Sequence, residues 1–305
     1  MEPRDEIARR ARGEARFDAV LAPRTAVRVG GPADLLVRPA DPDDLTAVLR
    51  ACRELEVPVL VLGGGANLLV ADRGVRGVVV RLPPAFAAEH VAGSTLVLSA
   101  GAPTSRLVSR AREAGLVGCE FVAGIPGTLG GAVAMNAGTR AGEMKDVVRR
   151  VELATADGTG WVAAAELELG YRTARLPPGA VVTRVEVELR PGDVAASAAV
   201  MKADVERRRA TQPLAQPTFG STFTNPPGDH AGRLIEAVGL KGYRVGNARW
   251  SEVHANFIVN VGGASARDVI ALVNLARARV RERFGVVLES EVRLMGEFAD
   301  DERIV

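Results

Sequence analysis

The sequence predicts an α+β protein in which short strands and helices alternate without forming a regular doubly wound sheet. Three observations favour this class. The chain has 305 residues, enough for more than one hydrophobic core. Of these residues 47% are hydrophobic and 25% are charged, which is typical of a globular protein. Strand and helix patterns alternate through residues 1–200, but tight turns rather than long crossovers separate many of the strands.

The most clearly marked early elements are a helix and the strand after it. Asp41 is a typical N-cap, and the proline that follows can occupy the first helical position. Apolar residues then recur at helical spacing from Leu45 to Leu55, so we expect a helix over 42–55. The β-branched run Val57 to Leu62 predicts a strand that enters a glycine turn. Further strands are predicted at 33–38, 77–82, 95–100, 147–155 and 180–189.

The last third of the chain begins with a helix and a loop. We predict a helix over 194–210. Prolines and glycines interrupt the stretch 211–230, so we expect no regular structure there. The remaining elements follow from apolar periodicity: a helix at 231–238 capped by Gly239, a strand at 256–261, a helix at 266–284 and a half-buried strand at 286–295.

Composition and charge exclude several classes of protein. A net charge of +2 is too small to favour a nucleic-acid binder or a membrane-surface protein. The N-terminus mixes both charge signs and lacks the apolar core of a secretory signal. The longest uncharged stretch, 121–139, is rich in glycine and does not suit a lipid-exposed helix. With only Cys52 and Cys119, both expected to be buried, the sequence predicts a soluble cytoplasmic protein.

The charges are unevenly distributed along the chain. Residues 207–250 carry seven basic side chains against two acidic ones, Asp229 and Glu236. This local excess could meet an anionic small molecule.

Two glycine-rich segments are candidates for binding a phosphorylated ligand. The first, 61–74, places three glycines after a strand, where backbone N–H groups can approach a pyrophosphate. It has neither a Rossmann nor a Walker pattern, and a tight structural turn explains it equally well. The second, 123–139, indicates irregular and apolar backbone that could wrap a nucleotide cofactor or form a buried crossover between domains.

Three polar positions could carry chemistry. Ser221 follows a glycine in a proline-rich loop and could transfer a proton, although such serines more often stabilise turns. Glu289 and Glu291 would share one face of the last strand, where burial would require a partner or raise a pKa. Arg172 alone would be read as a surface ion-pair residue. The three histidines lie far apart, so no metal site is expected.

In this order, the segments resemble the UDP-N-acetylenolpyruvoylglucosamine reductase (UDP-N-acetylmuramate dehydrogenase) family. The resemblance runs from about Thr25 to Glu297. Six ordered segments carry it: TAVRVGGP at 25–32, GGGANLLV at 63–70, GIPGTLGGAVAMNAG at 124–138, the pair Tyr171-Arg172, GSTFTNP at 220–226 and LESEVRLMGE at 288–297.

The resemblance implies a two-part FAD-binding fold of the PCMH or vanillyl-alcohol-oxidase type and a third, α/β domain that binds the substrate. The first FAD-binding part would span 1–82, and the second would span 83–205 with 286–305. Residues 206–285 would form the substrate domain, which contains the basic excess. The chain lacks a clear tyrosine-bearing insertion between Tyr171 and Ser221, so it resembles the shorter branch of the family.

The implied reaction reduces UDP-N-acetylglucosamine enolpyruvate to UDP-N-acetylmuramate for peptidoglycan precursor synthesis. NADPH would reduce FAD and leave, and the flavin would then deliver a hydride to C3 of the enol ether. By resemblance, Arg172 and Glu291 would polarise the substrate carboxylate, with Glu291 protonated beside its like-charged neighbour Glu289. Ser221 would supply the proton to C2.

The resemblance also implies the ligand-binding positions. Tyr171, Asn225, Lys241 and His254 would contact the UDP-sugar. The positions implied for FAD are Arg28, Gly63, Gly64, Gly65, Ala66, Asn67, Leu68, Gly124, Ile125, Pro126, Gly127, Gly131, Ala132 and Asn136. Ala66 stands where the family often has serine, so backbone amides would have to hold the pyrophosphate.

Further expectations concern partners and alternatives. The sequence predicts a small-molecule substrate, no nucleic-acid or membrane partner, and a monomer. The alternatives are another FAD-linked oxidoreductase of the same flavin fold, or a flavin-binding module without turnover. Ser221 and Glu291 are the residues that speak against the second alternative.

Overall fold

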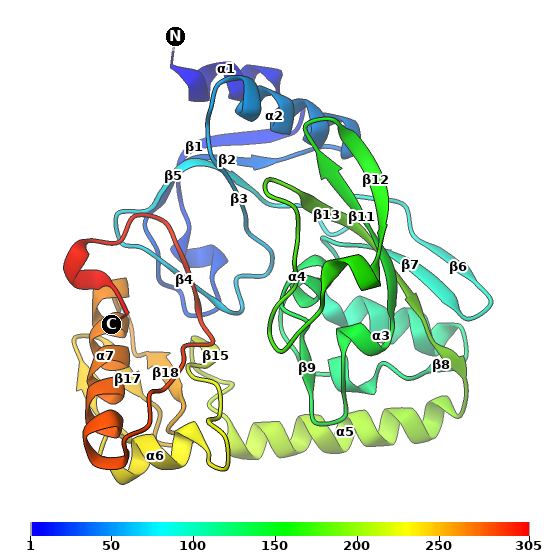
Figure 1. The fold of residues 1–305 in the computed structure, drawn as a ribbon. Coiled ribbons are helices and arrows are strands. Elements are labelled where there is room, and N and C mark those ends of the chain that lie inside the picture. Colours follow the sequence, from blue (N-terminus) through cyan, green and yellow to red (C-terminus); the bar gives the residue numbers. More distant parts are fainter. Residues whose placement is uncertain (1, 305) are drawn as a thin grey trace. The chain divides into compact units, whose positions relative to one another are not determined.

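The computed structural model describes residues 2–304 and has the α+β architecture that the sequence predicts (Figure 1). The chain divides into two compact units. The first contains the N-terminal residues through Phe17 together with Leu35–Gly64 and Gly77–Glu206. The second contains Asp18–Asp34, Gly65–Arg76 and the chain from Arg207 onward.

The helices of the described chain lie at intervals along the sequence. They are α1 (Pro3–Arg10), α2 (Pro42–Glu54), α3 (Thr104–Glu113), α4 (Leu129–Ala134), α5 (Val194–Thr211), α6 (Ala231–Ala237) and α7 (Ala266–Phe284). Short 3-10 turns are η1 (Ala22–Arg24), η2 (Glu120–Val122), η3 (Met144–Asp146), η4 (Ala164–Leu167) and η5 (Asp300–Glu302).

Most strands are short. They are β1 (Glu14–Val20), β2 (Pro32–Arg38), β3 (Val59–Val61), β4 (Leu68–Val70), β5 (Val75–Val80), β6 (His90–Ala92), β7 (Thr95–Ser99), β8 (Leu116–Val117), β9 (Gly138–Thr139), β10 (Gly142–Glu143), β11 (Val148–Thr155), β12 (Gly158–Ala163), β13 (Val181–Glu188), β14 (Arg190–Pro191), β15 (Thr218–Ser221), β16 (Arg244–Val245), β17 (Ala248–Trp250), β18 (Phe257–Asn260) and β19 (Arg293–Met295).

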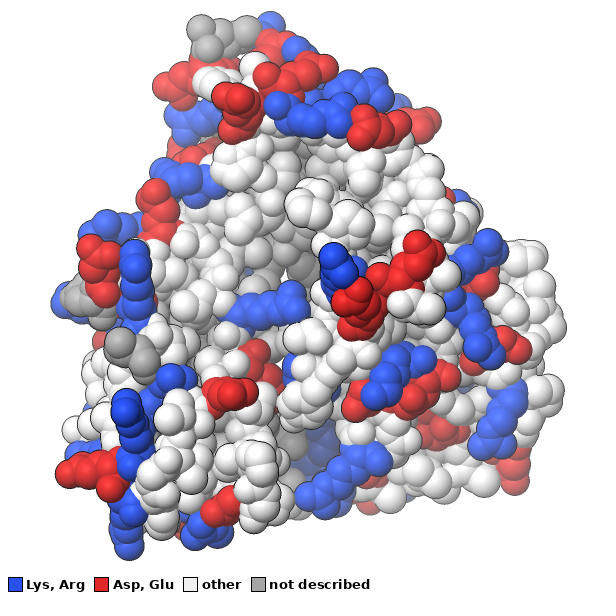
Figure 2. Space-filling view, in the orientation of Figure 1, with Lys and Arg blue, Asp and Glu red and all other residues white. Residues whose placement is uncertain are grey.

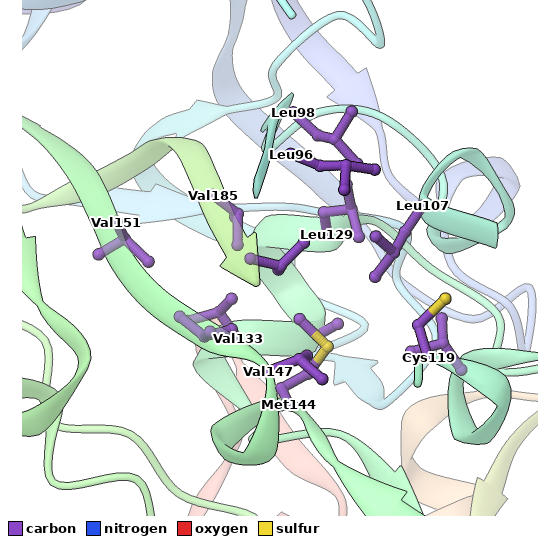
Figure 3. Packing of buried hydrophobic residues seen from close by; sticks show 14 of the residues in the cluster. Leu96, Leu98, Leu107, Cys119, Leu129, Val133, Met144, Val147, Val151 and Val185 are labelled. Carbon is purple, nitrogen blue, oxygen red and sulfur yellow. The ribbon is translucent and has the colours of Figure 1, made fainter. Parts of the chain in front are cut away.

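The larger core of the first unit lies between a five-stranded sheet and two helices. The strand order is β12-β11-β13-β7-β6, and neighbouring strands run antiparallel. Figure 3 shows Leu96 and Leu98 of β7 and Val185 of β13 facing Leu129 and Val133 of α4. These side chains are almost fully buried, so apolar burial holds α4 on the sheet.

A second sheet of order β1-β2-β5-β3 underlies the N-terminal helices. Strands β3 and β5 run parallel, with Val59 opposite Val78. Helix α2 begins as predicted, because the Asp41 side chain accepts a hydrogen bond from the Asp44 N–H at 2.9 Å. Leu45, together with other apolar residues of α2, packs in the core cluster of this sheet.

The surface over α1 and α2 mixes both charge signs, with blue and red atoms side by side in Figure 2. Arg10 forms ion pairs with Glu6 and Glu54, and Arg12 pairs with Asp41. The charges in this region are therefore paired rather than gathered into a patch of one sign.

The five-stranded sheet also carries a buried acid. Glu152 is 5% exposed and accepts hydrogen bonds from Thr183 Oγ1 at 2.7 Å and Arg184 Nε at 2.8 Å. Burial acts to raise the pKa of Glu152, but the hydrogen bonds from Arg184 and Thr183 outweigh it and lower that pKa. The guanidinium groups of Arg150 and Arg184 both lie over the Trp161 ring, at 4.5 and 5.2 Å from its centroid.

The second unit is built around the sheet β15-β18-β17-β16 and helix α7, which packs against β16 and β17 (Figure 1). Ser265 caps α7 by accepting from the Asp268 N–H, and Gly285 ends the helix in the left-handed conformation. Its buried stripe includes Val269 and Val273. A parallel pair of β4 and β19 joins two distant parts of the sequence within this unit.

The helices and strands expected from periodicity are confirmed at most positions. Helix α7 begins and ends at the predicted residues, and Gly239 ends α6 with φ +73°. The strands expected at 57–62, 33–38, 77–82, 95–100, 147–155, 180–189 and 256–261 are present as β3, β2, β5, β7, β11, β13 and β18, with no bound shifted by more than two residues.

Three expectations about regular structure were wrong. The segment 211–230 contains β15, because its prolines flank this strand rather than interrupt it. The segment 123–139 contains α4, whose N-terminus is capped by Thr128 through the Gly131 N–H at 3.3 Å. The last strand spans only β19, because residues 286–292 bond instead to a loop and to a side chain described below.

The loss of that strand removes one premise of the sequence argument. Glu289 and Glu291 do not lie on a continuous strand, and their environments differ, since Glu289 is exposed and Glu291 is half-buried. Helices α1 and α3 and strand β1 were not expected from the sequence.

The cysteines behave as apolar core residues. Cys52 and Cys119 are buried and form no disulfide. Burial raises the pKa of each thiol to about 12, so neither is a thiolate at neutral pH. The interpretation of both as small buried hydrophobes is confirmed.

Candidate active site

The first glycine turn offers a run of unused backbone donors. The N–H groups of Gly63, Gly64, Gly65 and Ala66 donate to no acceptor within residues 2–304. Backbone N–H groups that lack an acceptor suit an anion such as a pyrophosphate. Ala66 has no hydroxyl to offer a pyrophosphate, so these backbone N–H groups are the donors of this turn.

This turn packs against the second glycine-rich segment in the first unit. A Cβ added at Gly63 would lie 2.7 Å from Thr128 Oγ1, and one added at Gly64 would overlap the Cα of Gly127. At Gly64 the neighbour is backbone, so a side chain is excluded there; at Gly63 the Thr128 side chain would have to move. The structure thus brings together two of the segments that the sequence analysis singled out.

The second segment is anchored by Thr104 of α3. Its hydroxyl donates to the Ile125 carbonyl at 2.5 Å, and its N–H donates to the Gly127 carbonyl at 3.1 Å. Gly124 and Gly127 have φ of +73° and +120°, and neither of their N–H groups has an acceptor in the described part of the chain. Pro126 lies between these two glycines, and Ala132 is buried in α4.

Within the second unit, Gly65 and Arg28 both have a left-handed backbone conformation. A Cβ at Gly65 would meet the Arg24 carbonyl at 2.5 Å, and Gly65 has φ +64°. Arg28 has φ +56°, and its carbonyl accepts from Asn260 Nδ2 at 3.3 Å. The Arg28 side chain is exposed, and its guanidinium has no hydrogen-bonding or ionic partner among the residues that the structure describes.

Asn67 ties the start of β4 to the segment before β19. Its Nδ2 donates to the Glu291 carbonyl at 2.9 Å, and its carbonyl accepts from the Arg293 N–H at 3.2 Å. Leu68, the next residue, pairs with Arg293 in the parallel ladder. The Asn67 amide therefore fixes the backbone of Glu291.

The GSTF segment pairs with the same stretch of chain. The Thr222 carbonyl accepts from the Glu291 N–H at 2.9 Å, and the Thr224 N–H donates to the Glu289 carbonyl at 3.0 Å. This antiparallel register places the backbone of Glu291 beside Thr222, one residue from Ser221. The structure thus brings two predicted catalytic residues together within the second unit.

Ser221 ends β15, where its backbone pairs with Phe257 of β18. The residue is half-buried, and its hydroxyl has no hydrogen-bond partner within the described chain. The preceding Gly220 has φ +89°, which only glycine adopts easily, and it redirects the strand at this point. Ser221 thus retains a hydroxyl that can hydrogen-bond to a ligand.

In the first unit, Tyr171 and Arg172 form the tip of a two-residue turn. The N–H of Gly170 donates to the Thr173 carbonyl at 3.0 Å, and the reverse bond measures 3.3 Å. Arg172 has φ +58°, a strained conformation for a residue with a side chain. Its guanidinium lies 5.4 Å from the centroid of the exposed Tyr171 ring and donates to the Gly138 carbonyl at 3.2 Å.

Asn136 is 1% exposed, and both N–H groups of its side-chain amide are used inside the protein. Nδ2 donates to Glu143 Oε2 at 2.6 Å and to the Gly170 carbonyl at 2.8 Å, while Oδ1 accepts from the Lys145 N–H at 2.9 Å. The side chain is thus bonded to loop backbone and to a carboxylate.

The predicted substrate-binding residues of the second unit lie around α6. Asn225 Oδ1 accepts from the Ala231 N–H at 3.0 Å. His254 Nδ1 accepts from the Asn256 N–H at 3.2 Å, which places the proton of the neutral ring on Nε2. Burial, with the charge of Lys241, lowers the pKa of His254. His254 is therefore neutral at pH 7 and presents an N–H donor.

The basic excess of 207–250 is partly neutralised in the fold. Lys241 pairs with Glu236 at 3.0 Å, and Arg249 pairs with Glu252 at 3.0 Å. Arg233 pairs with Asp229, whose pKa is lowered to about 2 by this partner. Within residues 2–304, no group of acidic, histidine and cysteine side chains is arranged to hold a metal ion, and no helix has the length and apolar character of a membrane span.

Sequence reasoning missed the residues that hold these segments in place. Asn256 donates to the Phe223 carbonyl at 2.8 Å and accepts from its N–H at 3.0 Å, which fixes the loop after Ser221. Asn260 fixes the backbone at residues 27–28 in the same way, and Thr104 fixes residues 125–127. In the sequence each of these residues is only a polar residue at the edge of an apolar run, and that pattern is too common to identify a structural role.

The donor chemistry fits a dinucleotide of the FAD type. A side chain is excluded at Gly64, and a run of backbone N–H groups is left without acceptors in the described residues. A pyrophosphate supplies the anionic oxygens that such donors require.

Comparison with known proteins agrees with this reading. A family model described as "FAD binding domain" matches residues 33–163, and one described as "UDP-N-acetylenolpyruvoylglucosamine reductase, C-terminal domain" matches 212–295. UDP-N-acetylenolpyruvoylglucosamine reductase of Anaeromyxobacter sp. strain K is 74% identical, covering 98% of this chain and 91% of the relative. The Myxococcus xanthus reductase is 56% identical, covering 93% of each.

A solved structure is also similar. The crystal structure of UDP-N-acetylenolpyruvylglucosamine reductase (MurB) from Thermus caldophilus has a TM-score of 0.79 at 42% identity, covering 93% of this chain and 99% of that one. The extent of these matches decides the family, including the FAD-binding fold of the PCMH type and the family's own C-terminal domain. The chain belongs to the UDP-N-acetylenolpyruvoylglucosamine reductase family.

Proposed function

We propose that this chain reduces UDP-N-acetylglucosamine enolpyruvate to UDP-N-acetylmuramate with FAD and NADPH, in the synthesis of peptidoglycan precursors. When bound, FAD would supply the hydride chemistry that links NADPH oxidation to reduction of the enolpyruvyl group. The observation that carries the proposal is the pairing of residues 221–224 with 289–291. This pairing joins the backbone of a predicted proton donor to that of a predicted carboxylate-polarising residue.

The chain would hold FAD mainly through backbone N–H groups. The unused donors of Gly63, Gly64, Gly65 and Ala66 support a pyrophosphate contact. The remaining predicted FAD positions are Arg28, Asn67, Leu68, Gly124, Ile125, Pro126, Gly127, Gly131, Ala132 and Asn136. Among them, Arg28 offers a guanidinium without a partner in the described chain, which suits an anion.

Ser221 would donate the proton that C2 requires after hydride addition at C3. Its hydroxyl has no partner within residues 2–304, so no protein bond must break for it to act. A serine hydroxyl is a weak acid, and close positioning against a strongly basic carbanion makes the transfer feasible. Glu291, which we expect to be protonated in the complex, would hold the substrate carboxylate by a hydrogen bond.

Arg172 would supply positive charge to the same carboxylate as electrons move onto it. A guanidinium can form two parallel hydrogen bonds with a carboxylate, which both orients and polarises the group. Tyr171 is exposed beside it and would contact the sugar nucleotide. At the other end of the substrate, Asn225, Lys241 and the neutral Nε2–H of His254 would contact the diphosphate.

The proposal also covers the localisation, oligomeric state and domain bounds of the protein. The enzyme would act as a cytoplasmic monomer with no nucleic-acid or membrane partner. It would belong to the shorter branch of the family, and its FAD parts would comprise 1–82 and 83–205 with 286–305. Residues 206–285 would close over the substrate. The molar mass of the purified protein in solution, measured by light scattering, tests whether it is a monomer.

The two half-reactions of the Ser221→Ala variant test the function. We expect NADPH to reduce the bound flavin at a rate within about twofold of wild type, because Ser221 takes no part in that step. Reoxidation by the enolpyruvyl substrate should slow by about a thousandfold, because the proton donor is lost. Stopped-flow absorbance of the flavin measures both rates.

Ser105→Ala, at an exposed serine on α3, is the control and should change neither rate appreciably. Equal slowing of both half-reactions in Ser221→Ala would contradict the assigned role. A wild-type protein that binds no flavin, or whose reduced flavin is not reoxidised by the enolpyruvyl substrate, would contradict the proposed function itself.

A further inference from the structure

We propose that Asn136 is a positioning residue that holds the Tyr171-Arg172 turn in the geometry needed to polarise the substrate. This inference rests on the proposed role of Arg172. In this proposal Asn136 has a structural role, whereas the family resemblance implied that it contacts the flavin.

The first step of the argument is the bonding capacity of the Asn136 amide. A side-chain amide has two N–H donors. In Asn136 one N–H serves Glu143 Oε2 at 2.6 Å and the other serves the Gly170 carbonyl at 2.8 Å. The side chain is 1% exposed, so it has no further donor to offer a cofactor.

The second step concerns what the bond to Gly170 holds. Gly170 is the first residue of the turn, and its carbonyl accepts from both Asn136 and the Thr173 N–H. On the other side of the tip, the Arg172 guanidinium donates to the Gly138 carbonyl at 3.2 Å. Residues 136–138 therefore hydrogen-bond to the turn at two places, the Gly170 carbonyl and the Arg172 guanidinium.

The third step is the strain in the turn. Arg172 has φ +58°, a strained backbone conformation for a residue with a side chain. Such a conformation persists only where surrounding bonds impose it. Without the Asn136 bond, the turn could relax and move the guanidinium away from its position.

The fourth step explains why asparagine suits this position. Asn136 has φ +38°, and asparagine tolerates the left-handed region better than most residues. Aspartate would retain the acceptor for Lys145 N–H but would lose both donors and face the Glu143 carboxylate. Glycine would keep the backbone conformation and remove the amide. These two substitutions separate the conformational role of Asn136 from its hydrogen bonds.

The test measures both half-reactions of the flavin-loaded Asn136→Gly enzyme. We expect flavin reduction by NADPH to stay within about twofold of wild type. Reoxidation by UDP-N-acetylglucosamine enolpyruvate should slow by about 10- to 100-fold in its limiting rate, since a misplacement of about 1 Å can have an effect of that size. The matched control is Glu168→Gly, at another left-handed position near the turn, whose side chain is exposed. It should leave both rates unchanged.

A double-mutant cycle with Arg172→Ala then decides whether Asn136 acts through Arg172. If it does, Asn136→Gly should have little effect on reoxidation once Arg172 is already alanine. A loss of the same size in both backgrounds, or equal slowing of both half-reactions, would overturn the proposal. If Asn136→Gly does not fold, Asn136→Asp enters the same cycle, and failure of both to fold would assign Asn136 to stability instead. An Arg172→Ala enzyme with normal reoxidation would instead refute the proposed role of Arg172.

Discussion

At the residue scale, glycine matters where two backbones approach closely. Gly64 and Gly127 are in contact without a side chain between them, and a methyl group at Gly64 would overlap the other residue. Because both segments belong to the predicted flavin site, the contact fixes the turn whose N–H groups are free for a pyrophosphate.

This contact yields a prediction for Gly64→Ala. The added methyl should displace the turn and weaken FAD binding by at least tenfold, because backbone rather than a flexible side chain stands in its way. The flavin-to-protein absorbance ratio after gel filtration measures the loss. Gly160→Ala is the control, because a Cβ at Gly160 meets nothing within 4 Å. Full retention of flavin by Gly64→Ala would contradict the assigned turn.

The site residues differ in how far the sequence could predict them. Glycine segments are visible in a sequence because few other residues serve where side chains are excluded. The bonds of Asn67 and Asn136 could not be inferred, because an asparagine in a glycine-rich segment looks the same whether its amide binds a ligand or the protein's own backbone. Only the fold decides between these two uses.

At the element scale, the Glu152 and Arg184 pair stabilises the central sheet of the first unit. The carboxylate of Glu152 is almost fully buried, whereas Arg184 is about one-third exposed. Removing the guanidinium would leave a buried carboxylate with only the Thr183 hydroxyl as a side-chain partner.

We therefore predict that Arg184→Ala destabilises the protein by about 2 kcal/mol at neutral pH, between the values for exposed and buried pairs. The pKa of Glu152 is lowered in the folded state, so its contribution is present above the unfolded value of 4.5 and is lost as pH falls through the folded value. The difference between variant and wild type should shrink accordingly in acid. Urea unfolding at several pH values measures it.

The exposed pair of Arg149 with Glu188 is the matched control on the same sheet. Arg149→Ala should cost less than about 1 kcal/mol. Equal destabilisation by the two variants at neutral pH would show that burial of the acid does not matter.

The elements also show where periodicity succeeds and fails. Helix α7 could be predicted because its apolar stripe, serine cap and terminal glycine agree. Residues 286–292 alternate like a strand, yet the backbones of Glu289 and Glu291 bond to Thr222, Thr224 and the Asn67 side chain. Those partners come from distant parts of the sequence, so no local pattern could have identified them.

At the scale of the whole molecule, FAD should contribute measurably to stability. A ligand present at 100 times its dissociation constant stabilises the folded state by about 2.7 kcal/mol. We predict that removal of FAD lowers the thermal midpoint by several degrees and that added FAD restores it. Differential scanning fluorimetry measures both changes.

FMN is the discriminating ligand in this experiment, because it carries the isoalloxazine but no pyrophosphate. It should restore much less stability than FAD if the glycine turn holds the pyrophosphate. Equal restoration by both flavins would contradict that assignment.

The bond from Asn67 to Glu291 links residues 224 positions apart, both within the second unit. During synthesis the ribosome releases the N-terminal partner long before the C-terminal one. In the nascent chain, the Asn67 side chain therefore lacks its Glu291 partner until translation is almost complete. A premature stop before residue 291 should yield a product that cannot close this unit, and such fragments would be substrates for chaperones and proteases rather than partly active enzymes.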